Sequence, residues 1–67
     1  SAGFDGHKDD PLADFKLIEE DFFWITKKLK SFADKYCKKR LVSCLEGGYN
    51  IEALSKSSLA HVEGLIL

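Results

Sequence analysis

The chain has 67 residues, of which 45% are hydrophobic and 31% charged, and its formal net charge is -1. This composition is typical of a globular protein, but a domain this short buries a small share of its surface and is only marginally stable alone. No apolar run approaches the roughly 20 residues that span a bilayer, and the small net charge gives no general attraction to nucleic acid, so we expect neither a membrane nor a direct nucleic-acid partner.

The first four residues, SAGF, are small and apolar, as at the end of a β-strand. The polar loop DGHKDDPLAD follows and carries Asp5 and His7 close together. An oxygen and a nitrogen ligand at this spacing could serve a metal, but polar loops often contain such residues without binding anything. Asp9 and Asp10 are explained as turn residues before the proline.

Apolar residues recur at intervals of four and three from residue 18 to residue 36, which predicts an amphipathic helix. Acidic residues in its first turn and lysines in its later turns favour the helix dipole, and the basic cluster that follows is interpreted as a solvated helix end. Ile18 cannot cap this helix, so Asp14 is the nearest plausible cap. Phe23 and Trp24 widen the apolar face, which we interpret as core packing against a larger body.

Residues 40–45, RLVSCL, form a short apolar run that predicts a buried strand. Apolar residues at helical spacing after Asn50 predict a second helix from about residue 51 to residue 66. Strand, loop, helix, strand, Gly-Gly turn and helix then follow in order. The sequence therefore predicts an α/β fold, a β-α-β-α fragment of a parallel sheet.

Cys37 and Cys44 form no CxxC pair and no secretory signal is present, which indicates reduced thiols in an intracellular protein, cytoplasmic or nuclear. A disulfide between them is the less favoured alternative. We expect no thiol chemistry at Cys44, because a cysteine buried in a strand is normally inert, and we assign His61 no role. The absence of methionine leads us to expect a processed chain or an excerpt of a longer one.

The stretch LEGGYN, residues 45–50, leaves two interpretations open. It could be an ordinary turn into a helix, or its glycines could bring the backbone close to a ligand and aim Tyr49 at it. Ligands of parallel sheets gather beyond the carboxyl ends of the strands. If the two predicted strands are neighbours, we expect Asp5 and Tyr49 to face one crevice.

AGFDGHKDDPL and, about thirty residues later, LEGGYNIEAL resemble the zinc-dependent histone deacetylase family, within the arginase and deacetylase superfamily. The residues of the GFD-x-H and EGGYN motifs are more similar to those of the class II, bacterial deacetylase and acetylpolyamine amidohydrolase branches than to those of class I. The resemblance implies that residues 1–67 are a C-terminal segment of a deacetylase-like catalytic domain, not a complete domain, and part of a larger three-layer α/β/α fold. Many family members have a threonine or serine cap where this chain has Ile18.

The same resemblance implies roles for particular residues. Asp5 matches a zinc ligand, and Tyr49 matches the catalytic tyrosine whose hydroxyl binds the substrate carbonyl and steadies the oxyanion. Gly47 and Gly48 would let the backbone pass beneath the acyl pocket.

His7 and Asp10 match positions that support the metal loop without binding zinc. The family takes its other zinc ligands and its His-His acid-base pair from motifs that lie upstream of this stretch. We therefore expect residues 1–67 alone to be inactive and not to hold zinc, and the remainder of the deacetylase domain to be a partner. The substrate would be an acetylated lysine or an acetylpolyamine.

An alternative function belongs to a different class. The chain could be a degenerate fragment or a small interaction module that packs on a partner through the aromatic face around Phe22, Phe23 and Trp24. Large apolar patches commonly mark such contact surfaces.

Overall fold

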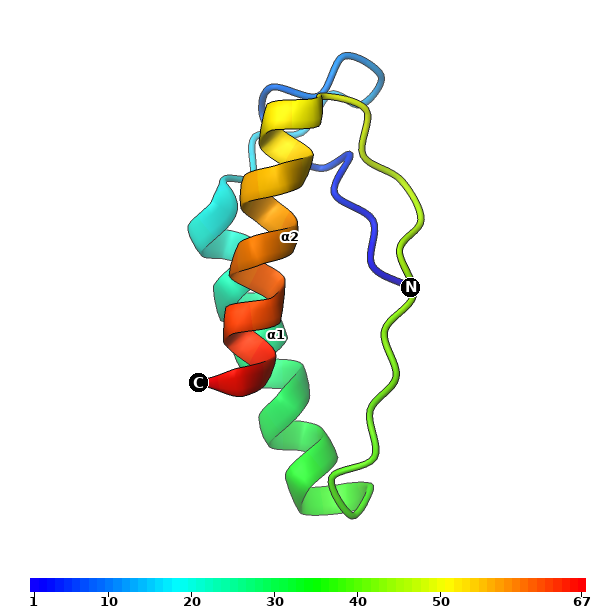
Figure 1. Cartoon of the computed structure of the whole chain (residues 1–67), viewed down its shortest axis with the longest axis vertical. Helices are drawn as coiled ribbons and strands as arrows, with labels where there is room; N and C mark the ends of the chain where they lie inside the picture. The colour runs from blue at the N-terminus through cyan, green and yellow to red at the C-terminus, as the bar shows by residue number, and fades with distance from the viewer.

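The computed structural model describes residues 1–67 and contains two α-helices, α1 (Glu19–Tyr36) and α2 (Ile51–Ile66). The two helices lie side by side and run in the same direction, so their N-termini meet at one end of an elongated molecule (Figure 1). An extended segment returns along the pair from the end of α1 to the start of α2. Both helices agree closely with the ranges predicted from apolar spacing.

The N-terminus of α1 is stabilised differently from the prediction. Ile18 occupies the capping position, and the Asp21 carboxylate accepts a hydrogen bond from the Ile18 backbone N–H at 2.8 Å. The proposed cap at Asp14 is therefore wrong, because a carboxylate inside the first turn reaches back to the free backbone donor. The helix ends at Tyr36, and Lys38 and Lys39 then take left-handed φ angles of 52° and 64° that reverse the chain.

The core between the helices and the N-terminal segment is small. Its buried hydrophobic residues are Phe4, Phe22, Ala33 and Ala53. The rings of Phe4 and Phe22 meet edge to face, with centroids 5.2 Å apart, so the N-terminal segment is held against α1.

The prediction of a β-α-β-α fragment of a parallel sheet is wrong, because the structure has two helices and no strand. The two predicted strand segments do run parallel, but they share a single isolated bridge, Ala2 to Leu45. Three backbone hydrogen bonds join residues 2–4 to residues 44–47: Ala2 N–H to Cys44 O, Glu46 N–H to Ala2 O and Phe4 N–H to Gly47 O. Such a pair is too short for a ladder, and a parallel pair gains less stability per residue than an antiparallel one.

Burial of residues 40–45 was also predicted wrongly. Val42 is 86% exposed, and Leu41, Leu45 and Cys44 are exposed as well. Parallel strands normally have both faces covered, and nothing in this chain covers the outer face of the segment. Cys44 is therefore not made inert by burial in a strand, as we had expected, although both cysteines are free thiols as predicted.

The aromatic face of α1 is divided between core and surface. Phe22 is buried and Phe23 is half-buried, whereas Trp24 is 61% exposed. Phe32 and Tyr36 extend the exposed part toward the end of the helix, with ring centroids 4.8 Å apart. No helix is both long and apolar enough to cross a membrane.

Candidate functional site

The candidate site lies at the end of the molecule where both helices begin. The loop of residues 5–17 and the Gly-Gly-Tyr turn of residues 47–49 meet there (Figure 1). Backbone hydrogen bonds from Lys8 N–H to Leu17 O and from Leu17 N–H to Gly6 O close the loop on itself. The hydrogen bond from Phe4 N–H to Gly47 O then sets the loop against the turn.

The Asp5 carboxylate packs directly on Gly47. A Cβ built on Gly47 would lie 2.8 Å from Asp5 Oδ1 and 2.9 Å from its Cγ, distances that real Cβ atoms essentially never show. Gly3 faces the same carboxylate, with a Cβ position 3.1 Å from Oδ1. The structure thus brings the Asp5 carboxylate against the backbone of Gly47, two residues before Tyr49.

Gly48 turns the chain toward Tyr49. Its φ of 140° is a conformation that L side chains rarely adopt, and a Cβ there would meet Leu54 Cδ1 at 2.9 Å and Phe4 Cβ at 3.3 Å. Tyr49 follows with 54% of its surface exposed, and its hydroxyl makes no hydrogen bond within the chain. That hydroxyl is therefore free to donate to a ligand.

Asp10 joins the loop to the turn. Its Oδ1 accepts the Tyr49 backbone N–H at 2.8 Å, and its Oδ2 accepts the N–H groups of Leu12 at 2.9 Å and Ala13 at 3.1 Å. Burial raises the pKa of the Asp10 carboxyl, but the backbone hydrogen bonds, led by the one from Tyr49, outweigh it and hold the pKa below its ordinary value. Asp10 is thus a buried, charged acceptor between two backbone segments.

His7, on the same loop, is only 2% exposed. Its Nδ1 accepts the Asp9 backbone N–H at 3.1 Å, so the neutral ring carries its proton on Nε2. That Nε2 has no hydrogen-bond partner, and the nearest carboxylate oxygen, Glu19 Oε1, is 3.4 Å away. The hydrogen bond from the Glu19 backbone N–H lowers the pKa of the Glu19 carboxyl, burial opposes this effect, and His7 adds to the lowering.

A small polar cavity of about 110 Å³ adjoins His7, lined also by Asp9, Glu19, Asn50, Glu52, Ala53 and Lys56. The Lys56 ammonium donates to the Glu52 carboxylate at 3.0 Å, and this hydrogen bond raises the pKa of Lys56. No group of three or more His, Cys, Asp or Glu residues in the chain could hold a metal ion. A catalytic zinc site takes three protein ligands, so Asp5 with its present neighbours does not fit a complete zinc site.

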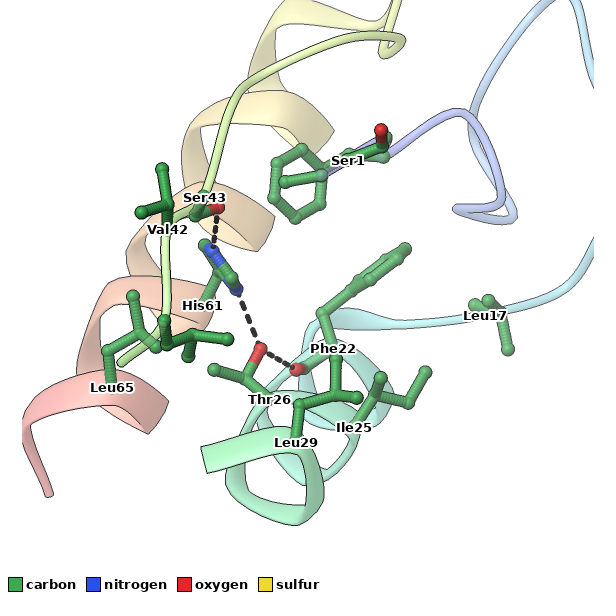
Figure 2. Close-up of a pocket in the computed structure, with 14 residues that line it drawn as sticks. Ser1, Leu17, Phe22, Ile25, Thr26, Leu29, Val42, Ser43, His61 and Leu65 are labelled. Carbon is green, nitrogen blue, oxygen red and sulfur yellow. Dashed lines mark hydrogen bonds between the residues drawn. The ribbon is translucent and has the colours of Figure 1, made fainter. Parts of the chain in front are cut away.

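A second feature, which sequence reasoning missed, surrounds His61. Figure 2 shows the ring between Ser43 and Thr26, with 2.7 Å hydrogen bonds at both nitrogens. Because the Thr26 hydroxyl donates its single proton to Phe22 O, His61 Nδ1–H donates to Thr26 Oγ1, and Nε2 of the neutral ring accepts the Ser43 hydroxyl proton. No local signal could have revealed this chain of bonds, because its members lie far apart in sequence.

The His61 relay, defined as Ser43, His61 and Thr26, lines an apolar groove of about 340 Å³. Neither Asp5 nor Tyr49 lines this groove, which separates it from the candidate site. The relay ties α1, α2 and the extended segment together.

Comparisons with known proteins place these motifs in one family. Residues 1–65 match the histone deacetylase domain. The chain is 56% identical to type-2 histone deacetylase 2 of Dictyostelium discoideum over 69 aligned positions, covering 98% of this chain and 4% of that protein. It is 44% identical to histone deacetylase 14, chloroplastic, of Arabidopsis thaliana (85% of this chain, 14% of that protein). A probable deacetylase of Methanothermobacter thermautotrophicus is 42% identical (97% and 18%). The chain therefore spans a small part of the relatives that it matches.

Proposed function

We propose that this chain, which belongs to the histone deacetylase family, is part of a zinc-dependent amidohydrolase that removes acetyl groups from acetyl-lysine or acetylpolyamines. The activity is that of the larger protein, and residues 1–67 alone are expected to be inactive. The chain would form the C-terminal segment of the catalytic domain, with the remainder of that domain as its partner and an intracellular location, cytoplasmic or nuclear.

One observation carries the proposal: the Asp5 carboxylate rests on Gly47, two residues before Tyr49. A carboxylate able to bind a cation and a free phenolic hydroxyl therefore extend from adjoining backbone segments. Asp5 would supply one oxygen ligand to zinc, and the other ligands would come from residues outside this chain. His7 and Asp10 would support the loop that bears Asp5 without binding the metal.

Tyr49 would act on the substrate carbonyl. Amide hydrolysis develops negative charge on the carbonyl oxygen, and a hydroxyl already aimed at that position stabilises the charge without reorganising. The exposed, unpaired hydroxyl of Tyr49 suits this task, because it has no bond within the chain to break. Gly47 and Gly48 would keep side chains out of the space that the acyl group needs.

Replacing Tyr49 tests the proposal in the complete protein. Tyr49→Phe removes only the hydroxyl, so we expect turnover of an acetyl-lysine peptide or an acetylpolyamine to fall about 10²- to 10³-fold. Tyr36→Phe is the matched control, since Tyr36 is also exposed but lies at the far end of α1. Near-normal turnover of Tyr49→Phe would defeat the assignment.

A second candidate function is the interaction module. The observation in its favour is the exposed aromatic surface of α1, formed by Trp24, Phe32 and Tyr36. An independent module would unfold cooperatively as an isolated 67-residue chain, whereas a segment that needs the rest of a domain would not. A thermal melt of the isolated chain, followed by circular dichroism, separates the two.

A further inference from the structure

One side-chain hydrogen bond connects the loop of residues 5–17 with the Gly-Gly-Tyr turn: the bond from Tyr49 N–H to Asp10 Oδ1, at 2.8 Å. It joins positions 39 residues apart in the sequence. Both ends of this bond belong to segments that carry proposed catalytic functions, since Asp5 lies on the loop. This hydrogen bond therefore links the position of the turn that bears Tyr49 to the position of the loop that bears Asp5.

Asp10 is a firm anchor. It is 7% exposed, its second oxygen holds Leu12 N–H and Ala13 N–H, and its own N–H donates to His7 O at 3.0 Å. A carboxylate that accepts three backbone donors stays charged, consistent with its lowered pKa. Each of these contacts restricts the direction in which Oδ1 points.

Tyr49 needs such an anchor more than most residues do. It follows Gly48, whose conformational freedom leaves the approach to the turn weakly determined, and its side chain is more than half exposed, so packing fixes it little. On its other side the backbone is held by the start of α2, where Asn50 Oδ1 accepts Ala53 N–H at 2.8 Å. With the Asp10 hydrogen bond to the Tyr49 N–H, the backbone is restrained on both sides of the tyrosine side chain.

We infer that Asp10 is a positioning residue for Tyr49: its carboxylate fixes the backbone from which the tyrosine hydroxyl is presented to the substrate. The inference rests on the proposed function of Tyr49. Asp10 touches no reacting atom in this arrangement and acts only through the tyrosine. A catalytic group displaced by about 1 Å can lose on the order of 10²-fold in rate, so the loss of this hydrogen bond is expected to be measurable.

Asp10→Asn in the complete protein is the sharpest substitution. The asparagine keeps the size of the side chain but has one oxygen, and that oxygen is best used toward the two donors of Leu12 and Ala13. Its amide N–H then faces the Tyr49 N–H. We expect kcat to fall about 10-fold or more, with KM and zinc content near normal. Asp9→Asn is the matched control, because the Asp9 side chain is 61% exposed and accepts no hydrogen bond.

A double-mutant cycle shows whether Asp10 acts through Tyr49. Asp10→Asn should lower kcat strongly when Tyr49 is intact and little further when it is combined with Tyr49→Phe. Equal fold-losses in the two backgrounds, or loss of zinc in Asp10→Asn, would overturn the inference while leaving the proposed function standing. Normal turnover of Tyr49→Phe alone would instead overturn the proposed function, and the positioning role with it.

A measurement on the unmodified protein covers the case in which Asp10→Asn fails to fold. Residue-resolved hydrogen exchange should show the Tyr49 amide protected, since its N–H is bonded to a buried carboxylate. The Gly48 amide, which donates no hydrogen bond in this chain, gives the internal comparison. Exchange of the Tyr49 amide as fast as that of Gly48 would overturn the inference.

Discussion

At the scale of single residues, the glycines of the turn have different tasks. Gly48 is needed for its backbone angle, whereas Gly47 is needed because the Asp5 carboxylate occupies the space where a side chain would begin. From the sequence, we expected both glycines to let the backbone approach a ligand closely. The structure adds that the nearest neighbour of Gly47 is the proposed metal-binding carboxylate itself.

Gly47→Ala should displace the Asp5 carboxylate, because the new Cβ would lie 2.8 Å from its Oδ1. We expect the complete protein to bind zinc more weakly, by about tenfold or more, the scale of loss on disturbing the surroundings of a metal ligand. Gly6→Ala, on the loop that bears Asp5, is the control, since its Cβ meets only the flexible end of Leu17, at 3.1 Å. Competition with a chelator measures both, and equal zinc affinities would refute the prediction.

Asp10 should also give the protein a defined acid sensitivity. Its pKa is lowered in the folded chain, so the stability that it contributes is complete above the unfolded-state pKa of about 4 and is lost as pH falls through the lower folded-state value. The stability difference between wild type and Asp10→Asn should therefore be constant from pH 7 to about pH 5 and shrink below about pH 4. Urea midpoints over this range test the sign. A difference that grows on acidification would contradict the assignment.

At the scale of elements, the two helices start by different means. The Asn50 side chain caps α2 directly, whereas α1 has an apolar residue at its cap and depends on Asp21. Both helices were predictable because apolar spacing and acidic first turns are local features. The proposed cap at Asp14 failed, because a residue inside the helix supplied the interaction.

Asn50→Ala should loosen the start of α2 by about 1 kcal/mol, because the Ala53 N–H loses its acceptor. Asn50→Ser retains a capping oxygen and is the matched control. The hydrogen-exchange rate of the Ala53 amide measures the local effect. Unchanged protection of this amide in Asn50→Ala would show that the Asn50 cap adds no stability to the start of α2.

At the scale of the whole molecule, the features that could not be predicted from the sequence depend on contacts between residues far apart in the chain. A β-strand forms only when it pairs with another strand. The apolar run of residues 40–45 carries no information about its partner, and in this chain it makes a single bridge. Placing Asp5 and Tyr49 after neighbouring strands led us to expect both at one crevice; the two segments do meet, through Asp5 and Gly47, although they form no sheet. The His61 relay lay beyond prediction, because its three members come from three separate segments.

Thr26→Val tests the importance of the His61 relay. Valine keeps the shape of threonine but leaves His61 Nδ1–H without its acceptor in a part-buried place, at a cost of about 1 kcal/mol. Ser58→Ala is the control, because the Ser58 hydroxyl bonds only locally to Ser55 O. Urea unfolding of the complete protein compares the two, and equal midpoints would mean that the relay adds no stability.

Asp5 and Tyr49 are proposed to serve one amidohydrolase site, Asp5 as a zinc ligand and Tyr49 as a hydrogen-bond donor to the substrate carbonyl. The most direct test measures zinc content and deacetylation together in the complete protein, for wild type, Asp5→Ala and Tyr49→Phe. We expect Asp5→Ala to lose both zinc and turnover, and Tyr49→Phe to keep its zinc and lose turnover. Full zinc occupancy in Asp5→Ala, or wild-type turnover in Tyr49→Phe, would contradict these roles.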